Sequence, residues 1–169
     1  MKPPPAPAAS SSEPQSGRRS ALAIDMDAFI PAALTNLAQK ITSTASATYR
    51  PRFGVGITDW RIIALLAGEP WIAPVRICEA TGLDKAAVSR SLRDLAEAGL
   101  VEVRAGEPNR RRLPVALTAN GLAAHDRIVI VALERQERLL KGFSSDERAQ
   151  LRAFIARMRR EVETIKTSV

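Results

Sequence analysis

APVRICEATGLDKAAVSRSLRDLAEAGLVEV, residues 73–103, predicts two short helices joined by a tight turn. Pro74 suits the first turn of one helix, and Gly82 suits its carboxyl end because glycine adopts a left-handed conformation at little cost. Asp84 is a favourable cap for the second helix, which Gly99 ends. Two short helices with a glycine-containing turn are typical of a helix-turn-helix motif. The apolar residues of the second helix repeat at spacings of four and three: Val88, Leu92 and Leu95.

A β-hairpin is predicted directly after these helices. Residues 100–105 and 112–117, LVEVRA and RLPVAL, alternate like two strands, and GEPNRR connects them. Pro114 lacks an N–H group, so we expect it at an edge position of this ribbon. Mutual repulsion among adjacent arginines at the hairpin tip favours an anionic partner. These arginines are Arg110, Arg111 and Arg112.

Helices are also expected before the helix-turn-helix motif. Residues 25–49 carry apolar side chains at helical spacing, with Asp27 as the expected N-cap. The prolines and glycines of YRPRFGVG, residues 49–56, predict a break, and a second helix is expected over residues 57–67. The apolar positions of the first helix are Ile30, Leu34, Leu37 and Ile41.

Two further helices are expected after Thr118. The first ends at Gly142, and Ser144 with Glu147 three residues later forms a capping box for the second. The first carries Leu122, Ile128, Ile130, Leu133 and Leu140. The second has an apolar stripe made of Leu151, Phe154, Ile155, Met158, Val162 and Ile165.

The apolar stripes at residues 30–41 and 151–165 are too large for a monomer of this shape to bury easily. They therefore predict that the chain forms a dimer. The alternative is that the two stripes pack against each other within one chain.

Composition narrows the class of protein. The 169 residues suit one globular domain with additions, and a 46% hydrophobic but only 4% aromatic composition favours helices packed by aliphatic side chains. The formal net charge of +7 points to nucleic acid or another anionic surface; the alternative is a basic protein without a polyanionic partner. Cys78 is the single cysteine, so no intrachain disulfide forms, as expected in a reducing cytoplasm. No apolar run is long enough to span a membrane.

The helix-turn-helix and hairpin resemble the MarR family of bacterial winged-helix transcription factors. Residues 81–103 are similar to that family's recognition helix and first wing strand, and residues 55–67 resemble its second helix. The resemblance covers residues 27–166. The family's wing signature, Asp-x-Arg-x5-Leu-Thr-x2-Gly, is matched in spacing by Asn109, Arg111, Leu117, Thr118 and Gly121.

Asn109 is the one departure from this signature. In the family, the aspartate at this position pairs with a neighbouring arginine and holds the wing, whereas asparagine keeps only its hydrogen-bonding capacity. By family position, Arg111 is the residue expected to enter the minor groove, with Arg110 and Arg112 on the DNA backbone.

The resemblance implies a fold that is mainly α with a small β-hairpin wing, namely a winged helix-turn-helix domain flanked by long dimerisation helices. It also implies an obligate homodimer that binds a pseudo-palindromic double-stranded DNA operator, usually as a repressor that a small anion releases. The expected organisation is a disordered arm rich in proline and serine (residues 1–24), an N-terminal dimerisation helix (25–50), the DNA-binding domain (51–118) and C-terminal dimerisation helices (119–169). The arm lacks the apolar stretch of a signal peptide.

Polar residues of the second short helix are candidates for DNA contacts. Lys85, Ser89 and Arg93 are spaced by four residues and form one stripe opposite the apolar face. The alternative is a solvated polar face whose arginines pair with Asp94 or Glu97. With the wing, the predicted DNA contacts are Lys85, Ala87, Ser89, Arg90, Arg93, Arg110, Arg111 and Arg112.

An effector site is expected near the junction of the first two helices. Arginines supply a fork for a carboxylate and aromatic rings supply a stacking surface, so the expected effector is an aromatic or heteroaromatic carboxylate or its CoA thioester. The alternative is that the rings belong to the core and the arginines contact phosphate or solvent. The candidate residues are Tyr49, Arg50, Arg52, Trp60, Arg61 and His125.

Catalysis, metal binding and cofactors are not expected. His125 is the single histidine, so no histidine-rich metal site forms and no convincing Ser/His/acid or Cys/His arrangement can be assembled. Cys78 is expected to be a small buried residue rather than a redox sensor. The competing function is an architectural winged-helix DNA-binding protein without an effector, which would show weak sequence preference.

Overall fold

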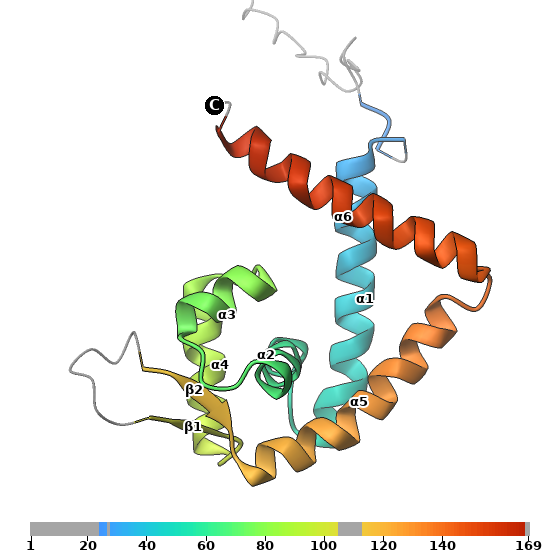
Figure 1. The fold of residues 1–169 in the computed structure, drawn as a ribbon. Coiled ribbons are helices and arrows are strands. Elements are labelled where there is room, and N and C mark those ends of the chain that lie inside the picture. The colour runs from blue at the N-terminus through green and yellow to red at the C-terminus, as the bar shows by residue number, and fades with distance from the viewer. Residues whose placement is uncertain (1–23, 27, 105–112, 168–169) are drawn as a thin grey trace, which may run out of the picture. The chain divides into compact units, whose positions relative to one another are not determined.

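The computed structural model describes residues 24–26, 28–104 and 113–167 (Figure 1). Its elements are, in order, α1 (Ile30–Phe53), α2 (Ile57–Gly68), α3 (Pro74–Thr81), α4 (Lys85–Glu97), β1 (Val101–Val103), β2 (Val115–Leu117), α5 (Ala119–Leu139) and α6 (Ser145–Thr167). Within these residues, six helices and one two-stranded antiparallel sheet confirm the predicted fold class, mainly α with a small β-hairpin. The carboxyl half of α1 and all later elements belong to one unit that begins at Thr42.

The helix-turn-helix consists of α3 and α4, and its ends lie where the sequence predicts. Pro74 is the first residue of α3, and Gly82 ends it with a φ of 66°. The Asp84 carboxylate accepts a hydrogen bond from the Ala87 amide at 2.8 Å and caps α4. Gly99, with a φ of 67°, follows the end of α4. These local signals suffice because Asp84, Gly82 and Gly99 pair backbone groups at the helix ends, and Pro74 lacks the N–H group that would be left unpaired at the start of α3.

The hairpin is shorter than predicted and has a third neighbour. β1 pairs with β2 in an antiparallel register that sets Val101 opposite Leu117. Ile72 pairs with the other edge of β2, because its amide donates to the Val115 carbonyl at 3.2 Å and its carbonyl accepts from the Val115 amide at 2.9 Å. Pro114 precedes β2 rather than lying in it. The hairpin tip, with its arginines and Asn109, lies outside the described residues.

The junction of the hairpin with α5 explains part of the wing signature. Thr118 caps α5 by accepting from the Gly121 amide at 3.1 Å, and its hydroxyl donates to the Gly99 carbonyl at 2.7 Å. A Cβ atom on Gly121 would lie 2.0 Å from the Leu100 carbonyl oxygen, closer than any real contact. Only glycine therefore allows α5 to pack against the backbone that enters β1.

The core is centred on α2, which packs against α3, α4, α5 and β2. Its deepest side chains are almost fully inaccessible to solvent, and they come from α2, α3, α4 and α5. They are Ile62, Ile63, Leu66, Ile77, Val88 and Ile128. The helix-turn-helix and hairpin are thereby fixed to the start of α5 by aliphatic packing, as the low aromatic content predicts.

The first helix continues through the predicted break. α1 includes Pro51 and ends at Phe53. A proline in the last turn removes only one donor, and the Gly54 amide, at a φ of 74°, still closes that turn by donating to the Arg50 carbonyl at 3.0 Å. The prediction of a break from residue 49 was therefore wrong by about one helical turn. The expected N-cap, Asp27, lies outside the described residues.

The last two helices begin and end close to their predicted positions. The Ser144 amide donates to the Glu147 carboxylate at 2.7 Å and the Glu147 amide donates to the Ser144 hydroxyl at 3.3 Å, which confirms the capping box. Hydrogen bonding of its carboxylate to the Ser144 amide and side chain lowers the pKa of Glu147. The turn before α6 is held by Arg148, which donates to Glu137, to the Leu140 carbonyl and to the Phe143 carbonyl.

α5 carries two apolar faces rather than one. Its buried positions include Ala124, Ile128 and Val131, whereas three of the predicted apolar positions are about half exposed. These are Leu122, Ile130 and Leu133. Within residues 24–26, 28–104 and 113–167, no helix is both long and apolar enough to cross a membrane.

Candidate nucleic-acid interface

α4 separates its apolar and polar residues as the sequence predicts. Val88 and Leu95 are 1% and 2% exposed and face α2 and α3, whereas Lys85, Ser89 and Arg93 are exposed. Asp84 at the N-cap fixes where the helix begins and therefore which residues share its outer face. The structure thus places Lys85, Ser89 and Arg93 on one exposed stripe.

No salt bridge found among the described residues neutralises the arginines of α4, Arg90 and Arg93. The alternative reading pairs them with Asp94 or Glu97, but no such pair is found in the described part of the chain. The cationic groups therefore remain available to an outside anion. Ala87, also a predicted contact, is half-buried.

A buried polar contact that sequence reasoning missed fixes α4 to the start of α2. Ser91 is 3% exposed, and its hydroxyl donates to the Asp59 carboxylate. The second Asp59 oxygen accepts from the Gly56 amide at 2.7 Å and caps α2. One carboxylate therefore holds both helices. Because the donors lie 35 residues apart (91 − 56), periodicity does not reveal this link.

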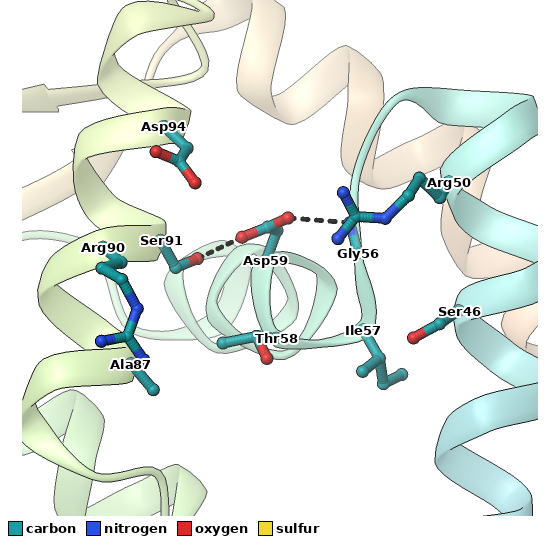
Figure 2. A pocket seen from close by; sticks show the side chains of 10 residues that line it. All are labelled: Ser46, Arg50, Gly56, Ile57, Thr58, Asp59, Ala87, Arg90, Ser91 and Asp94. Atoms are coloured by element: carbon teal, nitrogen blue, oxygen red, sulfur yellow. Dashed lines mark hydrogen bonds between the residues drawn. The ribbon is translucent and has the colours of Figure 1, made fainter.

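A cleft of about 270 Å³ lies between α4, the start of α2 and the carboxyl half of α1 (Figure 2). Arg90 enters its lining from α4, and Arg50 enters from α1 on the opposite side. Between them lies Asp59, and Asp94 is on α4 above Arg90 in this view. The Arg50 guanidinium lies so close to Gly56 that a Cβ there would be 2.9 Å from its Nη2 atom. Two arginines therefore line this cleft from opposite sides, together with hydroxyl groups and the carboxylates of Asp59 and Asp94.

The other predicted effector residues lie elsewhere. Tyr49 and Trp60 pack edge to face at 6.1 Å, and the His125 ring stacks on Trp60 at 5.7 Å. His125 Nδ1 lies 3.0 Å from an Asp126 oxygen, and Arg135 lies over the Tyr49 ring while donating to Thr44 and Thr48. This group, the aromatic cluster, joins α1, α2 and α5.

The two remaining arginines contact protein rather than a cavity. Arg52 lies 5.4 Å from the Phe53 ring, and the Arg61 guanidinium donates to the Thr81 carbonyl at the end of α3. The six candidates therefore do not form one site, because consecutive helical residues point in different directions. Cys78 is half-buried and packs against the core. No group of three metal-ligating side chains occurs in the described part of the chain.

An exposed pair at the base of the hairpin was also missed. Trp71, just before α3, has a φ of 60°, which is rare for a bulky residue. The Arg104 guanidinium lies over its ring at 4.3 Å. Neither residue belongs to a recognisable sequence pattern, because the contact depends on the pairing of Ile72 with β2.

This arrangement defines a winged helix-turn-helix protein, and comparisons with known proteins agree. The model of the MarR family matches residues 53–112. A MarR/EmrR family transcriptional regulator from Acinetobacter sp. ADP1 is 33% identical, with a TM-score of 0.78 over 83% of this chain and 99% of that one. The HTH-type transcriptional regulator PecS of Dickeya dadantii (strain 3937) is 27% identical over 114 residues, which are 66% of this chain and 69% of PecS.

A third similarity concerns the fold alone. The structure of FabT from Streptococcus pneumoniae in complex with DNA is 21% identical, with a TM-score of 0.63 over 80% of this chain and 96% of FabT. The chain belongs to the MarR family. It is therefore a transcriptional regulator of a DNA-binding class and not an enzyme.

Proposed function

We propose that this regulator is a homodimer that binds a pseudo-palindromic DNA operator through α4 and the hairpin tip, and that it acts as a repressor. The observation that carries this proposal is the exposed stripe of Lys85, Ser89 and Arg93 on a helix whose opposite face is buried. Residues 51–118 are the proposed DNA-binding domain, and the helices outside them are the proposed dimerisation region. The proposed location is a reducing cytoplasm, where the single cysteine, Cys78, would remain a free thiol.

The chemistry of α4 suits the major groove of DNA. Arginine and lysine donate to guanine, and each well-formed bidentate contact discriminates between bases by about 1–3 kcal/mol. Arg111 at the hairpin tip is the proposed minor-groove residue, with Arg110 and Arg112 on phosphates, because the negative potential of a narrow minor groove attracts arginine. The formal net charge of +7 adds attraction that does not depend on sequence.

Dimer formation is supported by the exposed apolar residues of α6. Phe154, Ile155, Val162 and Ile165 are each between 45% and 63% exposed. Large exposed apolar patches usually mark an interface. In a two-fold symmetric dimer, the two copies of α4 would enter successive major grooves about 34–36 Å apart.

The test of this function is binding to labelled DNA taken from upstream of the protein's own gene, compared with random DNA at several salt concentrations. We expect tighter binding to the upstream duplex and a steep loss of affinity as salt increases. Arg93→Ala should weaken specific binding, whereas Arg138→Ala, which removes an equal charge from the end of α5, should not. Equal and weak binding to both duplexes would favour the architectural alternative.

We further propose that a small aromatic or heteroaromatic carboxylate, or its CoA thioester, releases the DNA by binding in the cleft. Asp59 is already hydrogen-bonded to Ser91 and Gly56, so the polar groups left for a carboxylate include Arg50 and Arg90. A carboxylate between these arginines would hold Arg90 away from DNA. The aromatic cluster, with Tyr49, Trp60 and His125, is the second candidate surface for such a ring.

Calorimetry with a panel of aromatic acids tests the effector. We expect micromolar to millimolar binding of at least one acid, and its loss in Arg50→Ala, because the arginine fork supplies the charged hydrogen bonds. Arg52→Ala, two residues along the same helix, is the matched control. Loss of binding in a Trp60 variant but not in Arg50→Ala would move the site to the aromatic cluster, and no binding by any acid would contradict the effector proposal.

A further inference from the structure

Trp71 has an unfavourable backbone conformation, which persists only where the surrounding structure stabilises it. Its φ of 60° is in the left-handed region, where a Cβ atom comes too close to the following carbonyl oxygen. Among the described residues other than glycine, it is the only one with a positive φ. The residue is still 36% exposed, so it does not lie in this conformation in order to fill the core. Strained positions of this kind often mark functional sites.

The strained backbone brings the Trp71 ring under Arg104. The Arg104 guanidinium is 4.3 Å from the ring centroid, well inside the distance at which a cation is attracted to an aromatic face. The Arg104 amide also donates to the Pro114 carbonyl at 3.1 Å. Arg104 is therefore held at both its backbone and its side chain, although it is exposed to solvent.

The two residues lie on the outer face of the hairpin. Ile72, Val101 and Val115 belong to the core, and side chains alternate between the faces of a strand. Arg104 lies three residues after Val101, so alternation places it on the opposite face, whereas Trp71 is in a left-handed bend and its ring is placed there by its contact with Arg104.

The charge of Arg104 is uncompensated within the described residues. No salt bridge found there includes it. Arg76, on nearby α3, differs because both of its terminal contacts with the Glu69 carboxylate are 3.1 Å long. Those contacts also raise the pKa of Arg76. The pairing of Arg76 makes Arg104 the better candidate for an external anion.

We propose that Trp71 and Arg104 form a phosphate-binding platform at the base of the hairpin, which contacts the DNA backbone beside the groove that the hairpin tip enters. The inference rests on the proposed DNA binding. A guanidinium matches the geometry of a phosphate, and stacking on the ring reduces the freedom it loses on binding. Because phosphates carry no sequence information, the platform orients the wing on any duplex.

The experiment is a fluorescence anisotropy titration of the full chain with two labelled duplexes, one from upstream of its own gene and one scrambled. Salt is varied between about 50 and 200 mM, where phosphate contacts dominate the change in affinity. For Arg104→Ala, we expect about tenfold weaker binding to both duplexes. We also expect the slope of log affinity against log salt to fall by about two, one for each half of the dimer.

Variants of Trp71 test the platform without changing the charge. Trp71→Ala should weaken binding to both duplexes about threefold, since it removes one exposed cation–π contact from each half of the dimer. Trp71→Phe keeps an aromatic face and should bind nearly as the wild type does. Arg127→Ala removes an equal charge from an exposed position on α5 and should change neither affinity nor slope. Melting temperatures of all variants show whether each remains folded.

Each failure has a distinct meaning. If the wild type binds but Arg104→Ala keeps the same affinity and slope, the platform is contradicted and the proposed function stands. If Arg104→Ala weakens binding and Trp71→Ala does not, the ring has no role and the platform is again contradicted. A loss confined to the upstream duplex would indicate base recognition instead of phosphate contact. A wild type that binds neither duplex at low salt overturns both the platform and the proposed function.

Discussion

α4 and α6 are both amphipathic helices, but only α4 buries its apolar face within the described chain. Val88 and Leu95 of α4 are nearly inaccessible, whereas Phe154 and Val162 of α6 are 51% and 50% exposed. The difference shows that an apolar stripe predicts a contact without telling which molecule supplies it. In α4 the contact comes from α2 and α3, which leaves the polar face for DNA. In α6 we propose that a second copy of the chain supplies it.

The largest effect is therefore expected for a charge placed on the α6 stripe. Val162→Asp would put one carboxylate into each half of the proposed interface and remove two apolar side chains from it. A loss of about 2 kcal/mol for each copy corresponds to roughly a thousandfold weaker dimer. Sedimentation at several protein concentrations measures this shift.

The matched control is Ala153→Glu, on the opposite face of the same helix, which should leave the dimer intact. If Val162→Asp also left the association unchanged, the α6 stripe would not be part of the dimer contact. The alternative, in which this stripe packs within one chain, instead predicts that Val162→Asp lowers the melting temperature of a monomer.

The next largest effect is expected where α5 packs against the backbone that enters β1. Gly121→Ala would place a Cβ atom 2.0 Å from the Leu100 carbonyl oxygen, a backbone atom that a rotamer change cannot move. We expect the free energy of unfolding to fall by about 3 kcal/mol, at the upper end of the usual range for overpacking. Denaturant titration measures it. Gly142→Ala, which meets nothing within 4 Å, should be nearly neutral, and equal losses in both variants would refute this account.

These regions also show what the sequence can reveal about the fold. Pro74, Gly82, Asp84 and the capping box of Ser144 identified helix ends because capping depends on neighbouring residues alone. The continuation of α1 through Pro51 and the pairing of Ile72 with β2 were not predicted. The first depends on how the last turn closes, and the second on a strand more than 40 residues away (115 − 72 = 43).

The candidate site was predictable to a similar extent. Residues spaced by four on α4, such as Lys85 and Ser89, share a face whatever surrounds the helix. The proposed effector residues near residue 50 did not stay together, because Arg50 lines the cleft while Tyr49 points into the aromatic cluster. Adjacent residues on a helix point about 100° apart, so closeness in sequence does not predict a shared cavity.

A smaller effect is expected for the contact between α2 and α4. Ser91→Ala removes the hydroxyl that donates to Asp59, while Asp59 keeps its bond to the Gly56 amide. We expect the free energy of unfolding to fall by about 1 kcal/mol. Ser89→Ala, exposed on the same helix, should change it by less than about 0.5 kcal/mol. A Ser91 variant as stable as the Ser89 variant would show that the buried contact adds nothing.

The smallest effect is expected at the turn before α6, where the contribution of one ion pair to stability depends on pH. The hydrogen bond and the charge of Arg148 lower the pKa of Glu137, so this carboxylate has a lower pKa in the folded chain than in the unfolded chain. Its contribution to stability is therefore complete above the unfolded pKa and is lost as pH falls through the folded value. Glu137→Gln should melt below the wild type at neutral pH, and the two should converge at acid pH, below the folded pKa of Glu137. Glu134→Gln, exposed on the same helix, controls for the loss of a surface charge. A gap between wild type and Glu137→Gln that stays constant with pH would mean that Arg148 holds the turn before α6 through the Leu140 and Phe143 carbonyls alone.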